Sequence, residues 1–158
     1  MKILMVAPEV YPYAKVGGLA DVISGLSNAL YNLGHDVRII CPMYSDVPEE
    51  QFQCITKPMV VHLGKEDQEC NVVEFQLSGS SASVYLLEND RYYKGRRVYE
   101  FERNIDFEPY EPYVFLSRGS IDFCYQFEWI PDVIHCHDWM TSLVPIYIKY
   151  NEVNKPLG

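Results

Sequence analysis

The stretch from residue 2 to residue 41, KILMVAPEVYPYAKVGGLADVISGLSNALYNLGHDVRIIC, decides the fold. Residues 2–7 form a short apolar run closed by a proline, which is typical of a strand buried on both faces. Apolar residues at helical spacing then fill one side of residues 19–33, and Gly34 lies where a glycine ends a helix. Residues 36–41 show a second strand pattern. The stretch therefore predicts a β-α-β unit with parallel strands and a right-handed crossover.

The remainder of the chain adds strands and helices to this unit. Three further strand patterns predict an inserted β-hairpin or meander, and they cover residues 55–63, 71–77 and 83–87, the last two joined through 78–81. Helix, buried-strand and helix patterns then follow at residues 113–127, 133–137 and 138–150. We expect an α/β fold in which a Rossmann-like, mostly parallel sheet carries helices on both faces.

The segment of residues 88–112 is dense in charge and tyrosine and has no clear period, so it predicts a long surface excursion. Tyrosine rings stack on sugar rings, but tyrosine is also common in half-buried β structure. The sequence leaves both a binding role and plain packing open for this segment.

Composition places the chain among ordinary globular domains. Its 158 residues suffice for one α/β domain, and 48% hydrophobic with 22% charged residues excludes a disordered tail. No apolar run approaches the roughly 20 residues that cross a bilayer, and the opening run is too short for a signal-peptide core. We therefore expect a cytoplasmic protein without membrane contact. The net charge of −9 argues against a nucleic-acid partner, because phosphate-binding surfaces of that kind are basic.

The cysteines are odd in number and have no C-x-x-C spacing; they are Cys41, Cys54, Cys70, Cys124 and Cys136. This pattern excludes a disulfide framework and a zinc ribbon. It predicts buried free thiols.

The first candidate site is the loop Lys15-Val16-Gly17-Gly18-Leu19, between the first strand and the first helix. Paired glycines let the backbone approach a ligand closely, and the start of a helix offers free amides and positive potential. Lys15 adds a full charge, so an anion such as a phosphate is the natural ligand. The spacing matches neither a dinucleotide fingerprint nor a P-loop. The alternative is a tight turn with an exposed lysine.

The second candidate site is His135-Cys136-His137-Asp138-Trp139, at the end of the later strand. Both histidines point to one face of a strand, and Asp138 lies where the strand meets its helix. A metal site lacks a third ligand at recognisable spacing. Two other interpretations compete with a metal site: a structural one, with Asp138 as helix N-cap, and a polar ligand site formed by Asp138 and one histidine, which we favour.

Topology connects the two candidate loops. In an open α/β sheet, ligands bind outside the carboxyl ends of the strands, where the strand order reverses. The first strand is usually central, and the strand that opens the second half lies beside it. We therefore expect both loops to open on one crevice.

At these motifs the chain resembles a known family, the bacterial glycogen synthases and plant starch synthases. The resemblance rests on segments spread over nearly the whole chain: PEVYP (8–12), KVGGLADV (15–22), GHDVR (34–38), NDRYY (89–93), FLSR (115–118), HCHDW (135–139) and LVP (143–145). It implies a GT-B glycosyltransferase, built from two Rossmann-like domains with the active site between them. Such an enzyme transfers glucose from ADP-glucose to the non-reducing end of an α-1,4-glucan, retains the anomeric configuration and uses no metal or other cofactor.

The resemblance also implies roles for particular residues. Lys15 is expected to contact the phosphates of the nucleotide sugar, with Gly17 and Gly18 forming a backbone cradle beside the diphosphate and glucose. His137 and Asp138 are expected to line the sugar end of the cleft, as the candidate catalytic residues of an incomplete site.

The chain departs from the family pattern in three places and in its length. Val16 stands where the family usually has threonine, Met140 replaces the usual histidine or glutamine, and residues 106–113 lack the family's Asp-Asn pair and arginine. The resemblance implies that residues 1–158 are the amino-terminal catalytic domain, without the carboxyl-terminal Rossmann domain that holds the diphosphate. We expect this domain alone to be inactive, with its own carboxyl-terminal domain as partner.

Two other functions compete with this interpretation. One is a non-catalytic module that binds glucan or a nucleotide sugar, which the tyrosine-rich residues 88–112 favour. The other is an unrelated phosphate-binding enzyme, which needs a nucleophile beside a base; Ser24, or Cys136 next to His137, is the available candidate.

Overall fold

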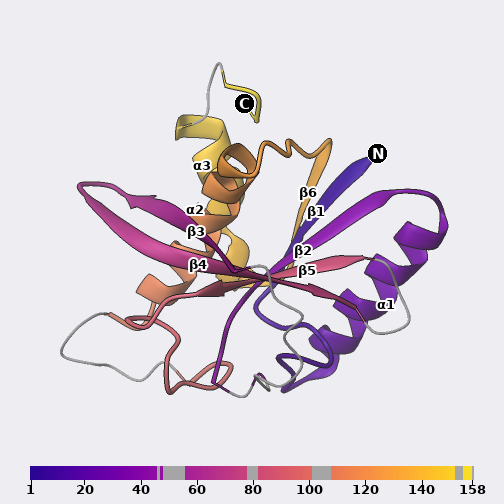
Figure 1. Ribbon diagram of the computed structural model, residues 1–158, viewed down its shortest axis with the longest axis horizontal. Helices are drawn as coiled ribbons and strands as arrows, with labels where there is room; N and C mark the ends of the chain where they lie inside the picture. The colour runs from indigo at the N-terminus through magenta and orange to yellow at the C-terminus, as the bar shows by residue number, and fades with distance from the viewer. Residues whose placement is uncertain (46, 48–55, 78–81, 101–107, 152–154, 158) are drawn as a thin grey trace.

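One mixed sheet organises the computed structural model, which describes residues 1–45, 47, 56–77, 82–100, 108–151 and 155–157 (Figure 1). Its strand order is β3-β4-β5-β2-β1-β6. The strands are β1 (Lys2–Val6), β2 (Asp36–Pro42), β3 (Thr56–Leu63), β4 (Glu66–Gln76), β5 (Ser83–Glu88) and β6 (Val133–Cys136). Strands β5, β2, β1 and β6 are parallel neighbours, whereas β3-β4-β5 is an antiparallel meander. The predicted meander beside a parallel sheet is confirmed.

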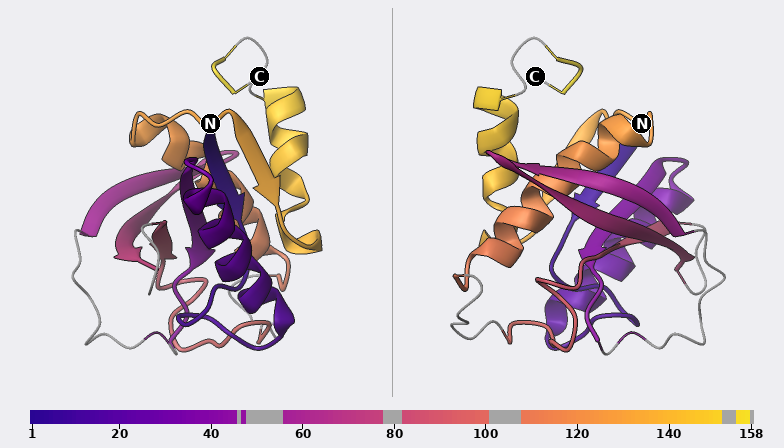
Figure 2. Two further views of the ribbon diagram at one scale, coloured as in Figure 1. Left: turned by 90° about the vertical axis from the view of Figure 1, so that its right-hand side faces the viewer. Right: turned by 60° about the vertical axis from the view of Figure 1, so that its left-hand side comes forward.

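Helices cover both faces of the sheet, as predicted. Helix α1 (Gly18–Asn32) lies on one face, and α2 (Glu111–Gln126) and α3 (Leu143–Asn151) lie on the other (Figure 2). A short 3-10 helix, η2 (Trp139–Thr141), precedes α3. No helix in the described ranges has the length and apolar composition needed to cross a membrane.

The opening β-α-β unit forms where the sequence pattern predicts it. Strand β1 pairs in parallel with β2, from Lys2 opposite Asp36 to Val6 opposite Ile40. Leu4, Met5 and Val6 are fully buried because α1 covers one face of β1 and the α2–α3 layer covers the other. Gly34, with φ +86°, follows α1 in the left-handed conformation that glycine adopts most readily.

Helix α2 packs directly on the meander at a small residue. A Cβ atom on Gly119 would lie 2.9 Å from Cδ1 of Leu87 and 3.4 Å from Cγ2 of Val61. Such a distance to Leu87 is shorter than carbon atoms tolerate without displacement, so the glycine allows the close approach of helix and sheet.

Several predicted boundaries need correction. The strand predicted over residues 133–137 ends at Cys136, and the helix predicted over residues 138–150 is divided into η2 and α3. Asp138, whose positive φ of 67° departs from strand geometry, ends the strand. The break between η2 and α3 lies at Ser142, ahead of Pro145, which has no N–H to donate to the Thr141 carbonyl. Strand β4 begins at Glu66, five residues before the predicted start at 71, because it pairs with β3 through a turn at Gly64, φ +64°. Residues 55 and 78–81 lie outside the described residues.

The predicted surface excursion of residues 88–112 is wrong for its first part. Tyr92 and Tyr93 are buried, and their ring centroids lie 5.1 and 5.8 Å from that of Phe115 on α2. Aromatic packing thus anchors this part of the segment to the core. Residues 101–107 lie outside the described residues.

The cysteines largely match the prediction of buried free thiols. Cys41, Cys70 and Cys124 are buried and free, and Cys136 is free and half-buried. Cys54 lies outside the described residues.

Candidate functional site

The two candidate loops leave the sheet at the same edge. Strands β1 and β6 are parallel neighbours that end side by side, with Val6 opposite Cys136. The His137 amide continues the pairing by donating to the Val6 carbonyl at 3.0 Å. The glycine loop after β1 and the loop after β6 therefore begin next to each other, as topology predicts.

A buried carboxylate shapes the glycine loop. The amides of Val16 and Gly17 both donate to Oε2 of Glu9, at 2.8 and 2.9 Å, and Glu9 is only 1% exposed. These two amides are therefore satisfied within the chain. The donors left for an external anion are those of the first turn of α1, beginning at Gly18, which have no intrahelical acceptor. The glycine loop thus offers fewer free amides to an anion than the sequence predicts.

Lys15 lies beside this helix start in an ion pair. Its Nζ contacts the two carboxylate oxygens of Asp21 at 2.6 and 2.8 Å, and it lies 5.1 Å from the centroid of the Tyr11 ring. Both members of the pair are about half-exposed. A phosphate that binds to Lys15 therefore has to replace the Asp21 carboxylate as its partner.

The histidines of the second loop lie close together, with their ring planes tilted by 38°. The ring centroids of His135 and His137 are 4.0 Å apart; His135 is exposed and His137 is buried. Burial, together with the nearby His135, lowers the pKa of His137 to about 4, so its imidazole is neutral at pH 7. Its Nε2 has no hydrogen-bond partner within the described part of the chain. A buried imidazole nitrogen left unpaired is available to a ligand.

Asp138 has an unusual backbone conformation. Its φ and ψ of 67° and 169° fall in a region that is almost restricted to glycine, and such strain concentrates at functional sites. Its carboxylate accepts the Trp139 amide at 2.6 Å, so the predicted N-cap exists, although it caps η2. The carboxylate stays exposed to the cavity described next.

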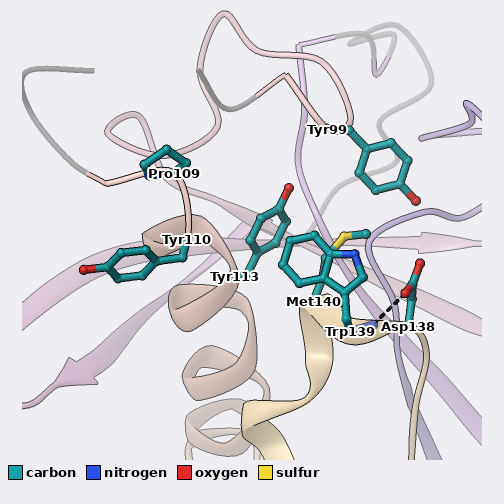
Figure 3. A pocket seen from close by; sticks show the side chains of 7 residues that line it. All are labelled: Tyr99, Pro109, Tyr110, Tyr113, Asp138, Trp139 and Met140. Carbon is teal, nitrogen blue, oxygen red and sulfur yellow. Dashed lines mark hydrogen bonds between the residues drawn. The ribbon is translucent and has the colours of Figure 1, made fainter. Parts of the chain in front are cut away.

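An aromatic cavity of about 740 Å³ opens beside Asp138 (Figure 3). Its lining comes from three segments: Tyr99, then Pro109, Tyr110 and Tyr113, then Asp138, Trp139 and Met140. The Tyr113 and Trp139 rings meet edge to face at 5.0 Å, while Tyr110 and Trp139 are each 61% exposed. In Figure 3, the Tyr99 hydroxyl points toward the side of the cavity that holds the Asp138 carboxylate. Exposed aromatic faces beside a carboxylate suit a sugar, which has both C–H faces and hydroxyl donors.

No metal-binding cluster is evident in the described ranges, where no group of three or more His, Cys, Asp or Glu side chains is arranged to hold an ion. The alternative nucleophiles are not activated either. The Ser24 hydroxyl donates to the Tyr11 carbonyl at 2.8 Å, and burial raises the pKa of Cys136.

Sequence reasoning missed four residues that shape this site: Glu9, Tyr99, Tyr110 and Tyr113. The tyrosine-rich composition of residues 88–112 was the available signal for two of the tyrosines. Nothing in the sequence distinguished them from Tyr92 and Tyr93, which are buried in the core.

Comparison with known proteins gives a consistent picture. A family model described as the starch synthase catalytic domain matches residues 2–157. The glycogen synthase of Treponema denticola is 37% identical over 155 residues, covering 98% of this chain and 32% of that protein. Glycogen synthase 1 of Geobacter sulfurreducens is 39% identical over 161 residues, covering 99% and 32%. The chain thus spans about a third of the length of these curated relatives.

A solved structure is similar in fold as well as in sequence. It is the catalytic domain of starch synthase IV from Arabidopsis thaliana bound to ADP and acarbose, with a TM-score of 0.80 and 27% identity. The match covers 96% of this chain and 31% of that one. The GT-B, Rossmann-like fold expected from the sequence is thereby confirmed.

Proposed function

The chain belongs to the starch synthase catalytic-domain family, and on this premise we propose that residues 1–158 are the amino-terminal domain of a retaining glucosyltransferase. The full protein transfers glucose from ADP-glucose to the non-reducing end of an α-1,4-glucan, without a metal or other cofactor. One observation supports this proposal most: the glycine loop and the His135–Trp139 loop start from adjacent strand ends, beside an aromatic cavity.

In this proposal the glycine loop holds the donor diphosphate. Lys15 exchanges the Asp21 carboxylate for a phosphate, and Gly18 brings the first-turn amides of α1 close to it. Gly17 acts through shape, because its own amide is bound to Glu9. The charge of Lys15 and the positive end of α1 favour the same ligand.

His137 and Asp138 line the sugar end of the site. The unpaired Nε2 of the neutral His137 ring serves as one hydrogen-bond partner for a hydroxyl group. The Asp138 carboxylate accepts hydrogen bonds from sugar hydroxyls, which are charge-assisted and therefore strong.

The acceptor glucan lies in the aromatic cavity. Trp139 and Tyr110 present exposed rings, and Tyr113 supports Trp139 from the side. Stacking of a glucose ring on such a face contributes about 1–2 kcal/mol.

The site is completed by the protein's own carboxyl-terminal domain. The chain covers about a third of its relatives' length, and a transfer reaction needs further groups to stabilise the departing diphosphate and exclude water. We therefore propose that residues 1–158 alone transfer no glucose.

Incorporation of labelled glucose into glycogen tests the function. The full-length protein should transfer from ADP-glucose, and the 158-residue chain should not. Trp139→Ala should raise the KM for glucan by roughly 5- to 30-fold. Tyr150→Ala is the matched control, because Tyr150 is an equally exposed aromatic residue on α3 outside the cavity lining.

Two results would contradict the proposal. Transfer by the 158-residue chain would show that no second domain is needed. Glucan binding by the full-length protein without turnover of either ADP-glucose or UDP-glucose would favour a non-catalytic binding module.

A further inference from the structure

Glu9 connects two parts of the site that are remote in sequence. One carboxylate oxygen accepts the Val16 and Gly17 amides, and the other accepts the hydroxyl of Tyr99, which lies 90 residues away. All three donors are neutral. A carboxylate that is 1% exposed is costly to bury without such partners, so the three hydrogen bonds hold it in this position.

The hydrogen bond to Glu9 sets the direction in which the Tyr99 hydroxyl donates its proton. A phenol has one proton, and here it is donated to Glu9, so the oxygen offers only lone pairs to other groups. Burial and the hydrogen bond to Glu9 raise the pKa of Tyr99, which keeps the phenol protonated. The Tyr99 backbone has φ +67°, a conformation that tyrosine seldom adopts, and the side-chain bond helps to hold it.

Tyr99 and Asp138 occupy the same side of the aromatic cavity (Figure 3). The Asp138 carboxylate has acceptor oxygens only, and Tyr99 has no proton left to give. This side of the cavity therefore offers hydrogen-bond acceptors, which match the hydroxyl donors of a sugar.

We propose that Glu9 is a positioning residue that couples the glycine loop to the cavity. One of its oxygens holds the glycine loop in place on the side that binds the nucleotide sugar. The other accepts the Tyr99 proton and so keeps it from pointing at the glucan. The inference rests on the proposed function for the identity of the two ligands.

Glu9→Gln separates these two tasks. The glutamine carbonyl can accept the loop amides as the carboxylate does. Its NH₂ group then faces the Tyr99 oxygen and makes the phenol an acceptor, so the phenol proton turns toward the cavity. The substitution preserves the size of the side chain and its contacts with the loop, but it turns the Tyr99 hydroxyl from a donor to residue 9 into an acceptor from it.

A double-mutant cycle in the full-length protein measures this coupling. Glu9→Gln should lower kcat/KM for glucan by roughly tenfold in the parent. In a Tyr99→Phe background it should lower kcat/KM by less than about threefold, because no phenol proton remains to be misdirected. An equal loss in both backgrounds, or no loss in the parent, would overturn the proposal.

The matched control is Glu74→Gln. Glu74 also accepts a tyrosine hydroxyl, that of Tyr85 at 2.9 Å, but it lies on β4 and outside the cavity lining. Its replacement should leave kcat/KM within about twofold of the parent. A loss as large as that of Glu9→Gln would show a general effect of replacing a Glu–Tyr pair and would overturn the assignment.

Hydrogen exchange of the glycine loop gives a readout that is independent of activity. Glu9→Ala should speed exchange of the Val16 and Gly17 amides at least tenfold by mass spectrometry, because it removes their acceptor, whereas Tyr99→Phe should leave it near the parental rate. Unchanged exchange in Glu9→Ala would overturn the role of Glu9. A full-length parent that transfers no glucose would contradict the proposed function instead, so the two failures are distinguishable.

Discussion

The seam, where residues 118–126 of α2 contact residues 60–62 of β3, differs in one polar group from the site edge, which is formed by the carboxyl ends of β1 and β6 and the loops that follow them. At the seam, Asp122 accepts the His62 amide at 2.8 Å and Arg118 at 2.6 Å, and the Gln126 side chain bonds both polar atoms of the Val60 backbone. At the site edge, Nε2 of His137 has no partner within the described residues. A satisfied polar group stabilises the fold, whereas an unsatisfied one costs stability and is available to a ligand.

This contrast separates the two regions experimentally. Changes at the seam should affect the free energy of unfolding and leave the chemistry intact. Changes at the site edge should lower kcat/KM and leave the free energy of unfolding nearly unchanged. The largest effect is expected at the seam.

Asp122→Ala should destabilise the domain by about 3–5 kcal/mol. The change removes the carboxylate that contacts the Arg118 guanidinium, which is 13% exposed, and it removes the acceptor of the His62 amide. Denaturant unfolding measures the loss. Asp67→Ala, which changes an exposed aspartate on β4, is the control and should be neutral within about 0.5 kcal/mol. A loss below about 1 kcal/mol would mean that the seam is no more stabilising than the surface.

The next largest effect belongs to the site edge. Lys15→Ala in the full-length protein should lower kcat/KM by roughly 30- to 1000-fold, because a lysine–phosphate contact in a closed cleft contributes about 2–4 kcal/mol. Lys15→Arg should recover little, since the guanidinium differs in shape and reach. Unfolding should change by only tenths of a kcal/mol, because the Lys15–Asp21 pair is half-exposed.

Lys149→Ala is the matched control for Lys15. Lys149 lies in the last turn of α3, away from the cavity lining, and its loss should be close to neutral. If Lys15→Ala kept its activity within about threefold of the parent, the phosphate assignment would be wrong.

The sequence predicts the framework of the site edge better than the contacts that complete it. The β1-α1-β2 unit follows from local periodicity and from Gly34, and the position of β6 beside β1 follows from topology, so the sequence locates the two loops correctly. The β1-α1-β2 unit depends on residues close together in the chain, whereas the place of β6 beside β1 follows a general rule of α/β topology.

The contacts that finish the site depend on remote partners. Glu9 binds two backbone amides and the phenol of Tyr99, and a backbone amide has no residue type that a sequence pattern can reveal. The cavity joins Tyr99, Tyr113 and Trp139 from three segments. The turn between β6 and η2 follows from the backbone angles of Asp138, which its residue type does not predict.

His137 is a site-edge residue that should nevertheless affect the free energy of unfolding. Its expected effect is the smallest of those predicted. The pKa of its imidazole is about 4 in the folded protein against an ordinary value of 6.5, so the unfolded chain binds the proton more tightly. The free energy of unfolding should therefore fall as the pH decreases from 6.5 toward 4 and be insensitive to His137 above 6.5. Between pH 7 and pH 5 this residue should account for a loss of about 1–2 kcal/mol.

Denaturant unfolding of the parent and of His137→Gln at both pH values isolates this contribution, because every other titrating group is common to the two proteins. His137→Gln should show the shallower pH dependence. Equal dependences in the two proteins would mean that the buried imidazole is protonated without cost, and the pH effect predicted for His137 would then be wrong.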